Sequence, residues 1–402
     1  MSSSHSSSAR GAPAQVPVVL RLLPLVVAVF IGYLVVGLAL PVLPLHLSRQ
    51  LGLGPLAVGA LVSSQFAAAL LTRAWAGAFA DTKGARRAVV GGLLLAAGSG
   101  VAYALSQAVA GPQAAVAMLL AGRLLLGAAE SLVTTGALSW GVALVGPQHA
   151  GKVMAWVGIA MYGAYAAGAP AGVALAGAWG FSCIAGATAL LPLVALPVVF
   201  ALRSTPPAAQ QRTPFYRVLG AVWLPGMGLA LCSVGFGVIT TFAALLFAAR
   251  GWGAASMVFT AFGLAFMAAR LCFGHLPDRL GGARVALACV AVEVLGQGLI
   301  WSADGAVQAV VGAALTGFGY SLAFPAFGVE AVRRAPPQAR GAAMGAYVAF
   351  LDLSLGVVGP AAGSVAAVHG VAAVYLAGAV LVALSLVVAL RLLSTGAPAR
   401  GA

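Results

Sequence analysis

Long apolar runs alternate with short polar breaks along almost the whole chain. A membrane-spanning helix needs about 20 predominantly apolar residues, and twelve such runs can be cut at polar or Gly/Pro positions. They lie at 20–45, 56–80, 88–107, 114–145, 150–175, 181–202, 218–248, 254–277, 284–303, 306–332, 341–367 and 371–393. This pattern predicts an all-α integral membrane protein with twelve transmembrane helices.

Composition supports a membrane protein over a soluble one. The 402 residues are 62% hydrophobic and 7% charged, whereas soluble domains are about 45–50% apolar and about 25% charged. The net charge of +14 would ordinarily suggest nucleic-acid binding. Here the cations stand in groups of one to three between apolar runs, where membrane topology accounts for them, so no nucleic-acid partner is expected.

The distribution of Lys and Arg predicts the orientation. Cytoplasmic loops carry an excess of these residues. With the N-terminus inside, the inner loops hold Arg10, Arg21, Lys83, Arg86, Arg87, Lys152, Arg203, Arg212, Arg217, Arg279, Arg284, Arg333, Arg334, Arg340, Arg391 and Arg400. The outer loops hold only Arg49 and Arg250. We therefore expect a bacterial inner-membrane protein with both termini in the cytoplasm.

One polar stretch separates two halves of similar length. Residues 203–217 read RSTPPAAQQRTPFYR, and their content of Pro, Gln and Arg is typical of a linker. The expected organisation is a disordered tail (1–17), an N-terminal six-helix bundle (18–202), a cytoplasmic linker (203–217), a C-terminal six-helix bundle (218–395) and a C-terminal tail (396–402).

The two halves also repeat each other. Arg73 stands eight residues before Asp81 and Arg270 eight before Asp278, at an offset of 197. At a second offset, of 190, GRLLLGAAESL (122–132) matches GAALTGFGYSL (312–322) at two Gly positions, one Ser and one Leu. These offsets predict two pseudo-symmetric bundles repeated in parallel.

Several motifs resemble those of the major facilitator superfamily. GAFADTKGARR (77–87) and GHLPDRLGGAR (274–284) resemble its signature loop, and Arg123 in LLAGRLLLG resembles its fourth-span Arg motif. GAYAAGAPAG (163–172) resembles the fifth-span motif typical of antiporters, with an echo in GVVGPAAG (356–363). The chain is most similar to the YhhS-type branch of the drug:proton antiporter-like proteins. The resemblance implies transport by alternating access and a monomer.

The two signature loops are candidate gates. Asp81 is expected near Arg340 and Gly341 at the start of span eleven, and a carboxylate at a helix N-terminus is worth about 0.3–1 kcal/mol. Asp278 would meet the start of span five, near Gly151 and Lys152, in the same way. The proposed gating residues are Gly77, Asp81, Arg86, Arg87, Gly274, Asp278, Arg279 and Arg284. The alternative is that these charges only anchor the loops.

Six charged residues fall inside the predicted spans, where each is costly unless it is paired or faces water. They are Arg73, Arg123, Arg270, Glu130, Glu293 and Asp352. Similar depth in the membrane suggests the pairs Arg73–Glu130 and Arg270–Glu293.

Glu130 is the first candidate for a proton carrier and Asp352 the second, with Arg123 as the third member of the proton-coupling set. A carboxyl group that exchanges a dry environment for an Arg neighbour would load and release a proton. The alternative is a static ion pair that fixes helix register. Arg123 either binds an anionic substrate or holds spans together, and Glu293, on an expected support helix, is assigned a structural role.

Aromatic residues with a few polar groups are expected to line the central cavity, which suits a small amphipathic solute. The candidates are Tyr33, Gln65, Trp140, Tyr162, Tyr165, Phe236, Tyr320, Phe324, Tyr347 and Phe350. The Gly-rich stretches are expected to let spans five and eight, and spans eleven and two, pack closely. No metal set, nucleotide-binding loop or cofactor motif is present, so the proton gradient is the expected energy source.

The sequence therefore predicts a secondary transporter that exports a small organic solute in exchange for protons. Two alternatives share the fold: a proton-coupled importer and a uniporter of a sugar or metabolite. A membrane-embedded enzyme would need a convergent nucleophile and base, or a metal set, and the sequence offers neither; the protein is predicted not to be an enzyme.

Overall fold

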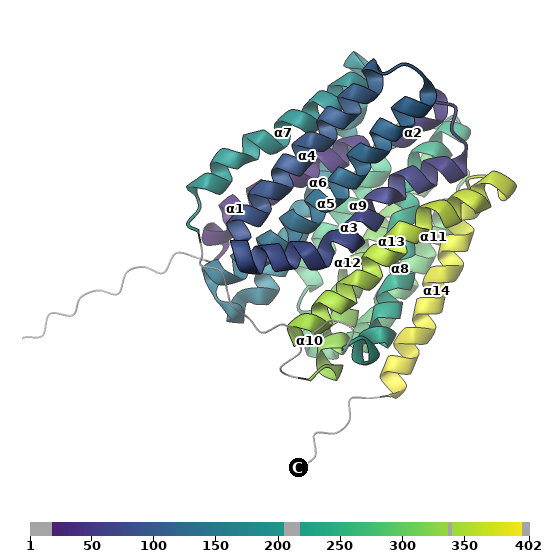
Figure 1. Ribbon diagram of the computed structural model, residues 1–402. Helices are drawn as coiled ribbons and strands as arrows, with labels where there is room; N and C mark the ends of the chain where they lie inside the picture. Colours follow the sequence, from purple (N-terminus) through teal and green to yellow (C-terminus); the bar gives the residue numbers. More distant parts are fainter. Residues whose placement is uncertain (1–17, 205–217, 337–339, 396–402) are drawn as a thin grey trace, which may run out of the picture.

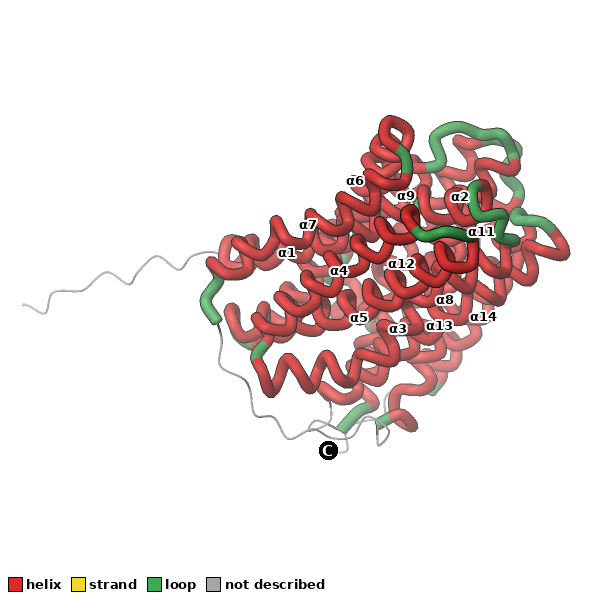
Figure 2. Tube along the Cα trace, turned by 45° about the horizontal axis from the view of Figure 1, so that its top comes forward, coloured by secondary structure: helices red, strands yellow, loops and turns green. Residues whose placement is uncertain are grey.

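The computed structural model describes residues 18–204, 218–336 and 340–395, and every regular element in this part of the chain is a helix (Figure 2). The predicted tails lie outside the described residues, and so do residues 205–217 of the predicted linker. The boundaries proposed for those segments remain predictions.

Twelve helices are long and apolar enough to cross a membrane, which confirms the predicted number. The first span combines α1 (Val18–Ala39) and α2 (Val42–Arg49), which are separated by a short break before Val42. The others are α3 (Pro55–Lys83), α4 (Ala85–Ala108), α5 (Pro112–Val145), α6 (Ala150–Trp179), α7 (Phe181–Ala201), α8 (Leu219–Ala249), α9 (Ser256–Phe273), α11 (Gly282–Trp301), α12 (Ala306–Arg334), α13 (Arg340–His369) and α14 (Ala373–Ser394). The short α10 (Leu276–Leu280) and η1 (Pro147–His149) lie in loops.

The helices form two bundles with matching internal contacts. In the first bundle α5 packs against α3 and α4, and α1 packs against α6 and α7. In the second, α12 packs against α9 and α11, and α8 packs against α13 and α14. In Figure 1, α1, α4 and α7 lie at the upper left and α8, α10 and α14 at the lower right. The predicted fold of two pseudo-symmetric six-helix bundles is confirmed.

The repeat extends to single hydrogen bonds. Ser131 on α5 donates to the carbonyl of Ala69 on α3 at 2.6 Å. Ser321 on α12 donates to the carbonyl of Phe266 on α9 at 2.8 Å. The serines are 190 residues apart and the two acceptors 197, the same offsets that the sequence motifs gave.

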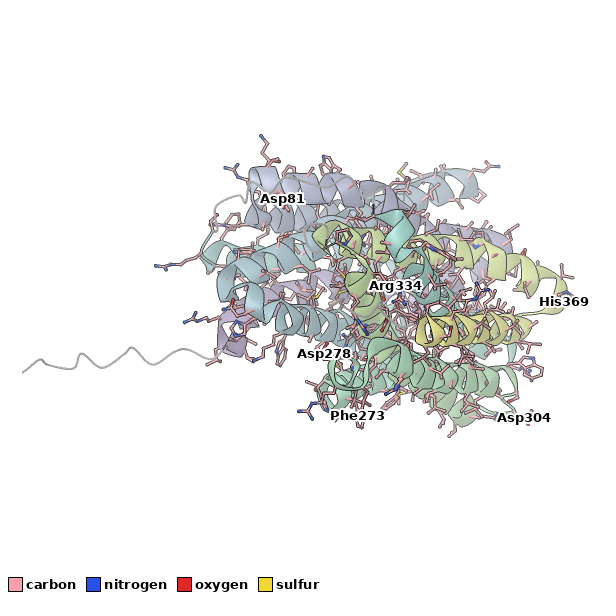
Figure 3. The ribbon with its side chains drawn as sticks, turned by 90° about the horizontal axis from the view of Figure 1, so that it is seen from below. Asp81, Phe273, Asp278, Asp304, Arg334 and His369 are labelled. Carbon is pink, nitrogen blue, oxygen red and sulfur yellow. The ribbon has the colours of Figure 1, made fainter. Side chains whose placement is uncertain are left out.

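Most Lys and Arg side chains of the described residues lie at one end of the helices, and only Arg49 and Arg250 lie at the other. We call the end that carries Lys83, Arg203, Arg334 and Arg391 the basic end, and the end that carries Pro55 and His369 the neutral end. Figure 3 shows Asp304 and His369 toward one end of the molecule and Asp81 toward the other.

The bundles meet along a seam between α3 and α13, and this seam is tightest toward the neutral end. Gly59 and Gly359 approach backbone to backbone, and the Gly359 N–H donates to the Ser63 hydroxyl at 3.1 Å. Gly363 also lies against the backbone carbonyl of Pro55. Without side chains, these glycines let the helices approach far more closely than alanine would. The predicted close packing of spans two and eleven is confirmed.

A second seam joins α6 to α9 near the middle of both helices. Gly263 lies against Ala166, and Thr260 donates to the Ala166 carbonyl at 2.9 Å. The predicted packing of spans five and eight is confirmed, but the fifth-span motif serves two neighbours. Its Gly168 and Gly172 contact α1 instead of α9.

The neutral end of the molecule is closed. On α8 every residue from Cys232 to Phe247 is buried, whereas Trp223 and Met227, nearer the basic end, are exposed. The short α2 contacts α8 from the other bundle, and α3 and α13 separate toward their basic ends in Figure 1. The structure therefore represents one conformer of the bundle pair, sealed at the neutral end.

Candidate functional site

An ion pair joins the two bundles inside the membrane. Arg73 on α3 binds Asp352 on α13 through two contacts: Nε to Oδ2, and Nη2 to Oδ1 at 2.9 Å. The Asp352 side chain is only 4% exposed and that of Arg73 18%. A two-point guanidinium–carboxylate contact fixes orientation as well as distance, so this pair ties α3 to α13 in a defined register.

Glu130 lies beside this ion pair. Its Oε2 accepts a hydrogen bond from Nε2 of the buried Gln65 at 2.8 Å. Arg73, Asp352 and Arg123 are its electrostatic neighbours. One turn further along α5, Thr134 hydrogen-bonds the hydroxyl of Tyr33. A small pocket between α1, α4 and α5 has the Glu130 side chain in its wall. We refer to Tyr33, Gln65, Arg73, Glu130, Thr134 and Asp352 as the polar cluster.

The predicted pairing of Arg73 with Glu130 is wrong in this conformer, because Arg73 binds Asp352. Depth along the membrane normal placed both carboxylates near Arg73 but did not say which helix faces it. Helix α3 packs against both α5 and α13, so Arg73 has an acid on each side. The cluster holds two carboxylates around one central cation.

The predicted pair of Arg270 and Glu293 is also wrong. The Arg270 guanidinium carbon lies 5.2 Å above the centre of the Phe266 ring, on its own helix. Glu293 is fully buried beside Gly235 of α8, and neither of its carboxylate oxygens has a hydrogen-bond partner among the described residues. The two side chains lie in different environments: Arg270 is at the seam between the bundles, and Glu293 is inside the second bundle.

Arg123 is 2% exposed and donates to the backbone carbonyl of Val62 on α3. Its Nε atom has no hydrogen-bond partner in the described part of the chain. The contact favours the interpretation that Arg123 holds α5 and α3 together. It lies two turns from Glu130 along α5, as the sequence indicated.

Five of the predicted cavity residues form one aromatic cluster at the middle of the molecule. Tyr33, Tyr162, Tyr165, Phe236 and Tyr320 contact one another in stacked and edge-on arrangements, and Phe262 and Phe266 complete the group. The rings come from α1, α6, α8, α9 and α12, so both bundles contribute. Tyr162 stacks on Phe266 across the seam with ring centres 3.7 Å apart.

The other predicted cavity residues lie elsewhere. Gln65 belongs to the polar cluster. Trp140 is fully buried and donates from its indole to the carbonyl of Arg203 at 2.9 Å, which fastens α5 to the end of α7. Tyr347 packs on Phe324 and donates to its carbonyl at 2.6 Å, while Phe350 lies against Gly226 of α8.

The signature loops lie at the basic end. Asp81 is half-buried on the last turn of α3, and its expected neighbours Arg340 and Gly341 have side chains outside the description. Asp278 on α10 is exposed, and Gly151 and Lys152 at the start of α6 are exposed as well. The latches remain predictions for a conformer closed at this end.

The remaining proposed gating residues lie close to Asp81 or Asp278 in sequence. Gly77 precedes Asp81 by one turn, and Gly274 and Arg279 flank Asp278. Arg86 and Arg87 open α4, where Arg86 lies over the Phe200 ring at 5.0 Å. On α11, Arg284 is exposed.

Sequence reasoning missed Glu330 at this end. Its carboxylate binds Arg333 at 3.3 Å and Arg334 at 2.5 Å, and it accepts from the backbone N–H of Ala283 at 3.3 Å. The Glu–x–x–Arg–Arg spacing on one helix was the available signal. Glu330 thus ties the start of α11 to the end of α12.

The repeat places different chemistry at equivalent positions of the two bundles. Arg73 corresponds to Arg270 at the offset of 197. At the offset of 190, Glu130 corresponds to Tyr320 and Asp352 to Tyr162. The structural repeat conserves both arginines, but only the first is faced by carboxylates.

Two six-helix bundles that are sealed against each other at one end define the class of two-bundle membrane transporters. The chain belongs to the Major Facilitator Superfamily, which it matches over residues 25–254 and again over 227–402. It is therefore a secondary transporter and not an enzyme.

Similar chains occur in several bacteria. An uncharacterized MFS-type transporter of Pseudomonas aeruginosa is 46% identical over 354 residues, which is 88% of each chain. One of Salmonella typhimurium is 46% identical over 337 residues, covering 84% of this chain and 87% of that one. This chain is therefore a multi-pass membrane protein with bacterial homologues.

Solved structures share the fold at low sequence identity. A mutant of the nucleoside transporter NupG aligns with a TM-score of 0.75 at 16% identity, over 92% of this chain and 99% of that one. The human organic anion transporter MFSD10 aligns with a TM-score of 0.69 at 18% identity, over 93% of this chain and all of that one.

Proposed function

We propose that this transporter exports a small organic solute in exchange for protons, as a member of the drug:proton antiporter-like branch. The basic end faces the cytoplasm of a bacterial inner membrane, because inner loops carry the Lys and Arg excess. The conformer described above then faces inward. The observation that carries the proposal is the polar cluster, in which two carboxylates share one arginine at the junction of the bundles.

The count of charges in the cluster makes it a proton site. Arg73 neutralises one carboxylate, and it binds Asp352 in this conformer. The second carboxylate, Glu130, is held by the neutral amide of Gln65. A buried carboxylate without a cation is costly, and a proton removes that cost. The cluster therefore holds one exchangeable proton between Glu130 and Asp352, with Arg73 pairing with whichever acid is ionised.

The position of the ion pair couples that proton to the movement of the bundles. Arg73 and Asp352 belong to different bundles, so their contact holds the α3–α13 seam together. When Asp352 takes up a proton, Arg73 turns to Glu130 within its own bundle, Glu130 gives up its proton as it pairs with Arg73, and the seam is released. While Asp352 is ionised the empty protein is locked, which antiport requires because an unlocked empty carrier would leak protons.

Glu130→Gln is expected to abolish the dependence of transport on a pH gradient. The introduced amide cannot take the proton or accept Arg73 as an ionised partner, so only one acid remains and it stays paired. Inverted membrane vesicles with an acidified lumen provide the measurement. Toxic metabolites and drugs are added one at a time to wild-type vesicles until one of them dissipates the pH gradient. That compound is then tested on vesicles that carry the variant.

The matched control is Asp304→Asn, which removes an exposed carboxylate at the neutral end that is not part of the polar cluster. This control should dissipate the gradient like the wild type. Intact coupled transport in both Glu130→Gln and Asp352→Asn would refute the assignment of the proton. Wild-type flux that is equilibrative and indifferent to pH would instead identify a uniporter.

A further inference from the structure

Arg270 is a cation at the bundle interface that the structure leaves without a counter-charge. It lies in the last turn of α9, the helix that packs on α6 of the other bundle, and its guanidinium covers one face of Phe266. Phe266 in turn stacks on Tyr162 of the other bundle. The Arg270 side chain makes no hydrogen bond or ion pair with any described residue, and its buried Nε atom is unsatisfied.

The internal repeat shows that this missing counter-charge is a difference between the two bundles. Arg73, its equivalent in the first bundle, has Asp352 as a partner and Glu130 as a neighbour. The equivalents of those two acids are Tyr162 and Tyr320. The electrostatic neighbours of Arg270 are accordingly the phenol groups of Tyr162, Tyr320 and Tyr347. Phenols can donate or accept a hydrogen bond, but they do not neutralise a guanidinium.

An unpaired arginine within a membrane protein is expensive unless it faces water or a bound anion. Cation–π contact with one ring contributes only about 0.5–2 kcal/mol, which does not replace a counter-ion. The other two intramembrane arginines of the described chain are already engaged, Arg73 by Asp352 and Arg123 by the Val62 carbonyl. Arg270 is thus the one whose binding capacity is unused.

We propose that the missing counter-charge is supplied by the substrate, which is a small organic anion with an apolar or aromatic body. A carboxylate or phosphate group would bind the guanidinium fork of Arg270 through two hydrogen bonds. The rings of Tyr162, Phe266 and Tyr320 would hold the apolar body, and the tyrosine hydroxyls would donate to the anion. This assignment rests on the proposed function only in taking the bundle interface as the transport path.

Such a substrate would also act on the seam. Phe266 and Tyr162 stack across the two bundles, and Arg270 is in contact with that stack. An anion seated on Arg270 must displace or reorient these rings. Substrate binding at Arg270 and protonation of the Arg73–Asp352 pair would therefore loosen the two seams of the interface by separate routes.

Binding can be tested without a pH gradient, so that a failure here is distinct from a failure of proton coupling. The purified full-length chain in lipid nanodiscs is titrated by calorimetry with 4-phenylbutyrate and phenyl phosphate. Their neutral and cationic counterparts, 4-phenylbutyramide and 4-phenylbutylamine, are titrated in parallel. We expect one or both anions to bind, and to bind at least tenfold more tightly than the amide or the amine.

Variants identify the residue. Arg270→Gln is expected to weaken anion binding at least tenfold, and Arg270→Lys to retain part of it because the charge remains. Arg49→Gln, which removes an exposed cation at the neutral end, should bind like the wild type. Carboxylate-only or phosphate-only binding would support the proposal and define the head group. Equal binding of the amide, unchanged anion binding by a folded Arg270→Gln protein, or no binding of either anion would overturn the proposal.

Discussion

Arg73→Gln is expected to destabilise the protein and to stop transport. The substitution leaves Asp352 buried without its partner, and breaking one side of a buried ion pair typically costs about 3–5 kcal/mol. The melting temperature of the purified variant should fall clearly below that of the wild type. The double variant Arg73→Gln/Asp352→Asn should recover much of this stability, because no uncompensated charge remains, and yet stay inactive.

The control is Arg333→Gln, which removes an arginine that is 48% exposed from its pair with Glu330. Exposed pairs are worth about 0–1 kcal/mol, so its melting temperature should hardly change. If Arg73→Gln were as stable and active as the wild type, the inter-bundle ion pair would have no role. A double variant less stable than the single one would contradict the electrostatic explanation.

Gly359→Leu is expected to hold the neutral end open. A Cβ atom at this position would collide with the Gly59 carbonyl oxygen and the Ser63 side chain across the seam. These groups are a helix backbone and a short side chain, so the strain is relieved only if α3 and α13 separate. Transport should be lost while the protein remains folded, because both bundles keep their own cores.

Maleimide labelling measures this opening. Leu43, on α2 at the neutral end, is 1% exposed, so a cysteine placed there should react slowly in the wild-type background and much faster with Gly359→Leu. Gly186→Leu on the outer helix α7 is the matched control, since a Cβ there meets no other atoms within 4 Å. Unchanged labelling and transport in Gly359→Leu would show that the glycine contact does not close the neutral end.

The sequence predicted the twelve helices well because the membrane imposes one length and one polarity on all of them. It also predicted the repeat, and the two offsets reappear in the Ser131 and Ser321 hydrogen bonds. Both predictions depend on position along the chain, which the sequence records directly.

The ion pairs were predicted less well because depth is only one coordinate of a side chain in a bundle. The second coordinate is the direction in which a side chain points around its helix axis, and the sequence contained part of that information. Asp352 precedes Gly356, Gly359 and Gly363 at spacings of four, three and four residues, which is one face of a helix. Since those glycines were expected to meet span two, Asp352 belonged to the same face, opposite Arg73.

Part of the aromatic cluster was not predicted from the sequence. Tyr162 and Phe236 were predicted, whereas Phe262 and Phe266 were not. The offset of 197 relates Phe262 to Gln65, which was itself a candidate, so the repeat could have identified it. Phe266 corresponds to Ala69 and carries no such signal, and only the close packing of α6 on α9 brings it to the interface.

The most direct test of the account is to measure distances between the bundles at both ends. Spin labels are placed in a cysteine-free background, one pair at Leu56 and Val368 near the neutral end and the other at Thr82 and Gly345 near the basic end; all four positions are exposed. We expect acidification from about pH 8 to about pH 5 to lengthen the neutral-end distance and to shorten the basic-end distance, because protonation of Asp352 removes the charge that holds the α3–α13 seam. The Asp352→Asn variant should show the low-pH distances at every pH. Distances that stay fixed, or that lengthen together at both ends, would contradict a rocking movement controlled by the Arg73–Asp352 pair.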